Sequence, residues 1–326
     1  MSPAEAAAAS GGVVTIGETM ALMSTRGHGP LAHSPGLDLG IGGAESNVAI
    51  GVRRLGVPAT WIGKAGRDPL GDLVVREIAA EGVRVLAIRD AEAPTALMIK
   101  ERRTAAHTSV WYYRTGHAGS RLRADEIDLD AVRSAAVLHV TGISLALSDT
   151  LAETVEQAIA VAHDAGVPVS FDLNYRGKLW SPETAAAAYR RVIPQCHVVF
   201  AGDDEARIAL GTPEETDLDP GELAARLAEL GPDQAVVKLG PRGAVALVDG
   251  VAYEQPAIPI TPLDTVGAGD AFVAGYLAEL VGGAGVVQRL RTAVTAGAYA
   301  CLSEGDWEGL PRRDELAGLV AGDVSR

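Results

Sequence analysis

The sequence predicts an α/β protein with a doubly wound, mainly parallel sheet flanked by helices. Short β-branched runs alternate with longer Ala- and Leu-rich segments along most of the chain. Such alternation is typical of parallel strands joined by helical crossovers. Aromatic residues make up only 4% of the chain, and small apolar residues suit helices packed closely on a parallel sheet. A length of 326 residues is enough to bury a continuous sheet between two helix layers.

The expected elements follow one another in chain order. Runs of β-branched residues predict strands at 13–17, 60–63, 137–141, 168–172, 197–201 and 235–239. Apolar residues spaced by three to four predict helices at 45–55, 70–81, 150–165, 182–192 and 221–230.

Two regions interrupt this alternation. Residues 20–40 are rich in Gly and Pro, and residues 95–117 contain the segments 96–100 and 108–112, which are typical of a hairpin. We expect both regions to fold together as a small β-sheet lid. The expected organisation is a disordered tail at 1–12 and a single α/β domain at 13–326, since no linker or repeat divides the chain.

Charge and composition exclude several classes of partner. The formal net charge is −14, so the average surface repels nucleic acid and anionic lipid. Residues 1–12 lack the features of a secretory signal, and no apolar stretch is long enough to span a membrane. Neither Cys196 and Cys301 nor the seven histidines have the spacing of a metal site. These observations predict a cytoplasmic protein without nucleic-acid or membrane partners.

The most informative stretch is residues 264–277, where a Gly-rich turn leads into an Ala-rich apolar helix. The start of a helix presents free backbone N–H groups and the positive end of the macrodipole, and small residues let a phosphate approach them closely. Asp270 lies in the first helical turn. A lone carboxylate there more often caps the helix, but the flanking Gly267, Ala268 and Gly269 favour a phosphate site with Asp270 as a base.

Other phosphate-binding motifs are missing. The glycine pattern of a dinucleotide-binding fold is absent after the first strand, and no lysine has the surroundings of a Walker-type loop. The landmarks of protein kinases are also missing. An oxidoreductase is therefore the least favoured class.

Two signatures resemble those of one known family. Residues 264–270 closely resemble the C-terminal signature of the ribokinase-like (PfkB-type) carbohydrate kinases, and residues 42–49 resemble their N-terminal signature. Similarity extends over nearly the whole chain after Gly12. Within the family, the chain looks most like the 2-keto-3-deoxygluconate kinases, judging by residues 111–116, 139–143, 172–176 and 179–182.

The resemblance implies an ATP-dependent kinase that converts 2-keto-3-deoxygluconate to 2-keto-3-deoxy-6-phosphogluconate, with a lid that closes over the sugar. Asp270 would take the proton of the primary hydroxyl, and the backbone N–H groups from Gly267 to Asp270 would hold the charge of the moving phosphoryl group. Because the transition state of phosphoryl transfer is loose, positioning and electrostatic stabilisation should exceed the contribution of the base.

The resemblance also implies a sugar site. Its members would be Gly42, Gly43, Asn47, Tyr112, Arg114, Arg176, Asp270 and Asp306. Arg114 and Arg176 favour a sugar acid, since a guanidinium matches a carboxylate with two hydrogen bonds. On the residues alone, either arginine could be a surface ion-pair partner, Asn47 could lie on a helix surface, and Asp306 could cap a loop.

For the nucleotide, the resemblance implies a second set of residues. These are Asn174, Lys238, Gly240, Gly243, Gly267 and Gly269, with Glu205 helping to organise Mg²⁺ through water. Two positions depart from the family pattern: Gly202 replaces an expected Asn, although Asp203 and Asp204 could compensate, and Met98 replaces an expected aromatic residue. Participation of a monovalent cation is left open.

Two alternatives accompany the sugar-acid kinase. The chain could be another kinase of the family acting on fructose, ribose or a nucleoside. It could also be a non-catalytic sugar sensor, although intact Gly267, Gly269 and Asp270 argue against this. An exposed β lid could further pair with a second copy of the chain across its edge.

Overall fold

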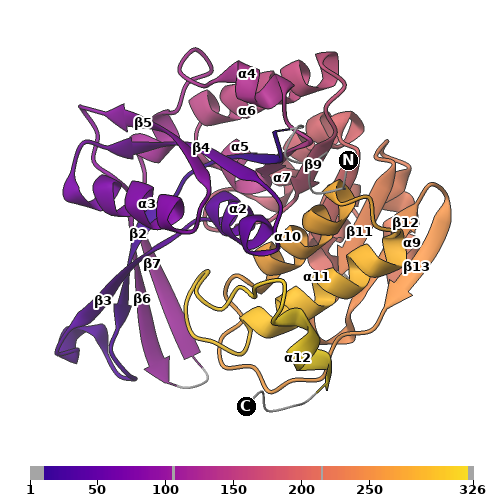
Figure 1. Ribbon diagram of the computed structural model, residues 1–326. Coiled ribbons are helices and arrows are strands. Elements are labelled where there is room, and N and C mark those ends of the chain that lie inside the picture. Colours follow the sequence, from indigo (N-terminus) through magenta and orange to yellow (C-terminus); the bar gives the residue numbers. More distant parts are fainter. Residues whose placement is uncertain (1–10, 105–106, 214–215, 322–326) are drawn as a thin grey trace.

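The computed structural model describes residues 11–104, 107–213 and 216–321, and within them two β-sheets organise the chain (Figure 1). The strands are β1 (Val13–Ile16), β2 (Met20–Thr25), β3 (Leu37–Gly42), β4 (Ala59–Gly66), β5 (Arg84–Asp90), β6 (Leu97–Thr104), β7 (His107–Tyr113), β8 (Val137–Thr141), β9 (Val169–Asp172), β10 (Val198–Gly202), β11 (Gln234–Lys238), β12 (Ala244–Val248) and β13 (Val251–Gln255). The helices are α2 (Ala44–Arg54), α3 (Pro69–Ala80), α4 (Leu129–Arg133), α5 (Gly142–Leu147), α6 (Asp149–Asp164), α7 (Pro182–Val192), α8 (Asp203–Leu210), α9 (Pro220–Ala228), α10 (Ala268–Val281), α11 (Val286–Ala300) and α12 (Leu316–Ala321).

The larger sheet confirms the predicted fold class. In the described part of the chain its nine strands have the order β13-β12-β11-β10-β9-β8-β1-β4-β5. The seven strands from β11 to β5 are parallel, and β12 and β13 extend the sheet as antiparallel strands. All six predicted strands belong to this sheet, with ends within a few residues of the expected positions. The edge strand β5 was not predicted.

Helices cover both faces of this sheet. Side chains of α2, α3, α10 and α11 form one buried cluster with one face of the strands, and those of α4 to α9 form the other. Residues alternate between the two clusters along a strand: Val198 and Phe200 face the first, and Val199 and Ala201 the second. This alternation is the pleat of a sheet buried on both sides. The arrangement leaves the carboxyl ends of the parallel strands as the edge where loops meet.

The smaller sheet, called the lid below, consists of β2, β3, β6 and β7 in the order β3-β2-β6-β7. It projects from one side of the larger sheet (Figure 1). The predicted hairpin is confirmed, because β6 pairs with β7 in antiparallel register with Lys100 opposite Val110. Strands β2 and β6 are parallel neighbours at the centre of the lid. Alternate residues of β6 therefore point towards the body of the protein.

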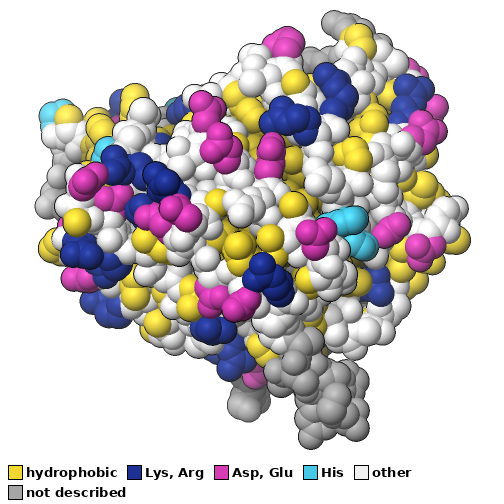
Figure 2. Space-filling view, turned by 90° about the horizontal axis from the view of Figure 1, so that it is seen from above, with side chains coloured by type: hydrophobic (Ala, Val, Ile, Leu, Met, Phe, Trp, Pro, Cys, Tyr) yellow, Lys and Arg dark blue, Asp and Glu magenta, His cyan; other side chains and the backbone are white. Residues whose placement is uncertain are grey.

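The expected tail at 1–12 lies largely outside the described residues, which start at Gly11. Gly12 belongs to the folded part, because its carbonyl accepts a hydrogen bond of 2.7 Å from the backbone N–H of Ala136. Among the helices of the described residues, none is long and apolar enough to cross a membrane. On the face shown in Figure 2, basic and acidic side chains lie interspersed.

Candidate active site

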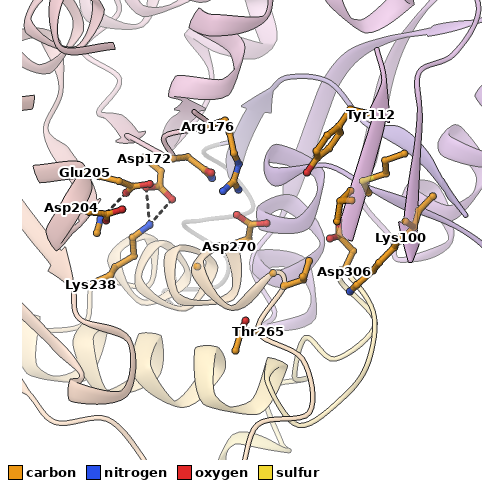
Figure 3. Close-up of a pocket in the computed structure, with 18 residues that line it drawn as sticks. Lys100, Tyr112, Asp172, Arg176, Asp204, Glu205, Lys238, Thr265, Asp270 and Asp306 are labelled. Carbon is orange, nitrogen blue, oxygen red and sulfur yellow. Dashed lines mark hydrogen bonds and ion pairs between the residues drawn. The ribbon is translucent and has the colours of Figure 1, made fainter. Parts of the chain in front are cut away.

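A cavity of about 450 Å³ lies where the carboxyl ends of β9, β10 and β11 meet the start of α10 and the inner face of the lid (Figure 3). Ligands of open α/β sheets bind at this edge, because the loops that follow the strands converge there. The cavity is lined by Leu22, Met98, Lys100, Val110, Tyr112, Asp172, Asn174, Arg176, Gly202, Asp204, Glu205, Lys238, Thr265, Val266, Gly267, Gly269, Asp270 and Asp306.

The predicted turn at the start of α10 forms the floor of this cavity. Gly267 is the N-cap and has φ 75, and a Cβ atom there would lie 2.0 Å from the backbone oxygen of Asp306. Only glycine fits this left-handed, closely packed position. At Gly269 a Cβ atom would meet only the Nζ of Lys238, at 3.8 Å, so glycine keeps the floor open. The N–H of Ala268 donates to Thr265 O at 3.3 Å, whereas those of Gly269 and Asp270 have no backbone partner among the described residues and suit an anion.

Asp270 lies in the first turn of α10 and is only 8% exposed. Burial raises the pKa of its carboxyl group from 3.8 to about 7, and the nearby Asp306 charge acts in the same direction. A carboxyl group with such a pKa can accept a proton near neutral pH. In Figure 3 its side chain lies at the centre of the cavity, between Arg176 and the start of the helix.

Asn47 connects two carboxyl groups. Its Nδ2 donates to Asp270 Oδ2 at 2.8 Å and to Asp306 Oδ2 at 3.2 Å. Burial raises the pKa of Asp306 to about 6. The Oδ1 atom of Asn47 is buried and has no hydrogen-bond partner among the described residues. Asn47 therefore lies in the site, not on a helix surface, and has an acceptor free for a ligand hydroxyl.

A second cavity of about 100 Å³ shares Asp270, Asp306 and Arg176 with the first and extends towards α2. Arg114 lines it, but its guanidinium contacts the buried Glu18 carboxylate at 2.6 Å. Gly42 supports this region from β3, because a Cβ atom there would lie 2.1 Å from Asp306 Oδ2. Gly43, the N-cap of α2, lines the same cavity.

The basic side chains that line the two cavities differ in their partners. Lys100 pairs with Asp264, Arg114 with Glu18, and Lys238 with Asp172. Arg176 differs, because its guanidinium forms no hydrogen bond or ion pair with the residues that the structure describes; its backbone oxygen accepts from the N–H of Leu179 at 2.8 Å, and its side chain is exposed. Its charge acts to lower the pKa of Asp270 and of Asp306, and it stays accessible to an anionic ligand.

The end of the cavity near β10 and β11 contains the predicted nucleotide residues. Lys238 contacts both oxygens of Asp172 at 2.8 Å (Figure 3). Asn174 follows β9 with φ 41 and lines the same cavity. Gly240 and Gly243 belong to the turn after β11 and are not among the described residues that line either cavity.

Glu205 has a structural role as well as a position at the cavity. Its two oxygens accept hydrogen bonds from the backbone N–H groups of Tyr175, at 2.8 Å, and Gly202, at 2.6 Å. These bonds cap the start of α8 and tie it to the loop after β9. Among the described residues, no group of three or more His, Cys, Asp or Glu side chains is arranged to hold a metal ion.

Sequence reasoning missed several lining residues, including Asp172, Lys100 and Thr265. Asp172 had a visible signal, since it is a polar residue at the end of a predicted strand. Lys100 had none, because its partner Asp264 lies 164 residues away in the chain.

A buried carboxyl group of raised pKa at the start of a helix, in a cavity between a doubly wound sheet and a lid, is the arrangement expected of a phosphotransferase that acts on an alcohol. The family model described as pfkB family carbohydrate kinase matches residues 11–313. The chain belongs to this family of carbohydrate kinases.

Individual relatives agree with this assignment. A 2-dehydro-3-deoxygalactonokinase of Haloferax volcanii is 37% identical over 288 residues, which cover 88% of each chain. A 2-dehydro-3-deoxygluconokinase of Bacillus subtilis is 32% identical over 94% of this chain and 95% of its own. The crystal structure of an uncharacterised sugar kinase from Pyrococcus horikoshii in complex with ATP has a TM-score of 0.80 and 26% identity, covering 93% of this chain and 96% of that one.

Proposed function

We propose that the protein transfers a phosphoryl group from ATP to the primary hydroxyl of 2-keto-3-deoxygluconate, also called 2-dehydro-3-deoxygluconate. The observation that carries this proposal is the Asp270 carboxyl group, which lies beside the free N–H groups of α10 and lines both cavities. The larger cavity takes the phosphates of ATP, and the smaller one takes the sugar. The transferred group passes between them at Asp270.

In this proposal the chain supplies a base and an anion site. Asp270 takes the proton of the attacking hydroxyl, and its raised pKa makes it basic enough to do so near neutral pH. The backbone N–H groups of Gly267 and Gly269 face the charge that develops on the phosphoryl oxygens, while that of Ala268 donates to Thr265 O at 3.3 Å and stabilises the turn. Because these donors belong to a fixed helix end, they need little reorganisation during the reaction.

Magnesium accompanies ATP, and the described residues suit an ion held mainly by phosphates and water. Asp204 and Glu205 line the cavity near Lys238, and their carboxylates would contact the hydrated ion through water. Bound there, the ion would neutralise phosphate charge. Asn174 and Lys238 would contact the nucleotide itself.

At the sugar end, Arg176 is the residue that favours an acid. Its guanidinium forms no hydrogen bond or ion pair with the described residues and lines the cavity. A sugar carboxylate would supply that partner through a bidentate pair. Arg114, Tyr112 and Asp306 would complete the walls, and the free Oδ1 of Asn47 would accept a hydrogen bond from a sugar hydroxyl.

The C4 epimer is a second candidate substrate, since a relative named as a galactonokinase shares 37% identity. The experiment is an ADP-release assay with both 2-keto-3-deoxy acids, fructose, ribose and a nucleoside. The proposal requires the highest kcat/KM for one of the two acids. A higher kcat/KM for a neutral sugar or the nucleoside would overturn it, and sugar binding without any turnover would favour a sensor.

We further propose a cytoplasmic enzyme that self-associates through the lid. The outer face of the lid exposes Leu39, Trp111 and Tyr113 by 54%, 52% and 55%. Such a row of large apolar side chains is typical of a protein contact. Light scattering of the Trp111→Glu variant tests this, because loss of an oligomer present in the wild type supports the lid interface, and an unchanged oligomer excludes it.

A further inference from the structure

Lys100 is a buried cation that reaches from the lid into the body of the protein. It lies in β6, where Ser24 of β2 and Val110 of β7 flank it in register. The side chain is 3% exposed. Its Nζ binds the Asp264 carboxylate and lies 3.4 Å from the backbone oxygen of Gly305. Figure 3 shows this side chain extending from the lid strands on the side of Asp306.

The two partners of Lys100 support the phosphate-binding turn from both sides. Asp264 Oδ1 accepts a hydrogen bond of 3.1 Å from the backbone N–H of Val266, directly before Gly267. Gly305 precedes Asp306, whose backbone oxygen packs against Gly267 so closely that no side chain fits. The position of the turn therefore depends on the segment containing Asp264 and the segment containing Gly305 remaining together.

The chemistry of these partners is that of a cation site. A carboxylate and a backbone carbonyl are oxygen donors that hard cations bind. A largely buried carboxylate beside an incoming phosphate also needs a positive charge to offset it. Here the Lys100 ammonium group already binds the Asp264 carboxylate and the Gly305 carbonyl oxygen. A free monovalent cation therefore does not fit between Asp264 and Gly305.

We propose that Lys100 is a positioning residue whose ammonium group is the built-in cation of the phosphate-binding turn and replaces a monovalent cation there. The lysine holds the Asp264 and Gly305 segments together and cancels the carboxylate charge near the phosphates. Because Lys100 belongs to the lid, the lid also contributes to the phosphate site. The inference rests on the proposed function, in which this turn binds the transferred phosphoryl group.

A neighbouring ion pair provides a matched control. Arg102 lies two residues further along β6, on the same face of the strand, and contacts Glu304 at 2.7 Å. This pair also joins the lid to the loop before Asp306, but Glu304 is 53% exposed, and no hydrogen bond from it to the turn is found among the described residues. If Lys100 only anchored the lid and had no role at the turn, Lys100→Met and Arg102→Met should have similar effects.

The first part of the experiment uses the wild-type protein in chloride salts of K⁺, Na⁺ and tetramethylammonium at constant ionic strength. Turnover with the best substrate of the sugar panel and the Kd of a non-hydrolysable ATP analogue are both measured. We expect neither quantity to change by more than about twofold, a small effect against the tenfold change that 1.4 kcal/mol produces. A wild-type protein that requires K⁺ for turnover or for analogue binding overturns the proposal.

The second part compares Lys100→Met with Arg102→Met. Misplacement of a reacting group by about 1 Å can cost 10²-fold, so Lys100→Met should lower kcat by about tenfold to a hundredfold and weaken analogue binding. K⁺ should restore part of both losses and tetramethylammonium should not, because only a small cation fits beside Asp264. Arg102→Met should show a smaller loss without cation rescue.

Three results contradict the role of Lys100. The first is a Lys100→Met variant whose kcat and analogue affinity equal those of the wild type. The second is an equal loss of kcat and affinity in Lys100→Met and Arg102→Met, and the third is a loss in Lys100→Met that K⁺ does not reverse. A wild-type protein inactive on every sugar contradicts the proposed function instead, while the cation dependence of analogue binding still tests Lys100. If Lys100→Met does not fold, the wild-type salt series decides.

Discussion

Asn47 and Asp270 are 223 residues apart in the chain, and the side-chain N–H of Asn47 donates to the Asp270 carboxylate at 2.8 Å. The same Nδ2 atom contacts Asp306 at 3.2 Å. The two family signatures thus meet at one hydrogen bond, which orients the proposed base. Asp270 is buried and Asp306 half-buried, and both have raised pKa values.

The pKa of Asp270 predicts the pH dependence of catalysis. A base must be deprotonated in the free enzyme, so kcat/KM should rise with pH and level off above an apparent pKa of about 7. Burial is the main cause of the raised pKa of Asp270, and the Asp306 charge adds to it. The Asp306→Asn variant should therefore move this limb to lower pH. A pH profile of Asp306→Asn that equals the wild-type profile would show that the charge of Asp306 does not affect the titration of Asp270.

The ionisation of Asp270 that should increase activity at higher pH should decrease the free energy of unfolding. The folded-state pKa of this group is raised, so the folded state binds the proton more tightly than the unfolded chain. The resulting destabilisation is absent below about pH 4 and complete above about pH 7, at roughly 1.4 kcal/mol per pKa unit. Asp270→Asn should therefore raise the Tm at pH 8 and leave it nearly unchanged at pH 4. A Tm difference that does not grow with pH would contradict this.

Arg176 should determine binding of the acid. A hydrogen-bonded charge contributes about 1.5–3 kcal/mol, so Arg176→Met should raise KM for the 2-keto-3-deoxy acid by roughly tenfold to a hundredfold. KM for a neutral sugar should change little. Steady-state kinetics with both sugars checks this, and a parallel rise for the neutral sugar would exclude carboxylate recognition.

Arg114 should behave differently, because its partner is in the protein. Its loss leaves the Glu18 carboxylate buried and unpaired, with 1% of the side chain exposed. Removing one member of such a pair costs about 3–5 kcal/mol. Urea unfolding of Arg114→Met should show this loss, and adding Glu18→Gln should recover much of it. Equal stability of the single and double variants would exclude the pair as the cause.

The sequence predicts those parts of the fold that depend on local signals. The helix at 182–192 has the predicted bounds, because Ser181 caps it and Pro182 occupies its first position. The strand at 137–141 also has the predicted bounds. It is buried throughout, and Val137, Leu138 and Val140 supply its apolar signal. The missed strand β5 is an edge strand of intermediate burial with charged residues at both ends, and such strands lack a clear apolar pattern.

The site shows the same division. Gly267 and Asp270 belong to one short motif and can be recognised in it, and Asn47 follows from the second motif. The ion pairs of Arg114 with Glu18 and of Lys100 with Asp264 cannot be recognised in this way, because each forms between distant segments that only the tertiary fold brings together. Motifs therefore identify residues of the proposed substrate site, and the structure identifies which of their charges are already paired within the protein.

The proposed role of the turn is tested most directly by the single-turnover rate of the Asp270→Ala variant at saturating ATP and sugar acid. Loss of a positioned base should lower this rate by about 10² to 10⁴, while the Kd of an ATP analogue changes little. A variant that phosphorylates the sugar at the wild-type rate would contradict the assignment of Asp270 as the base.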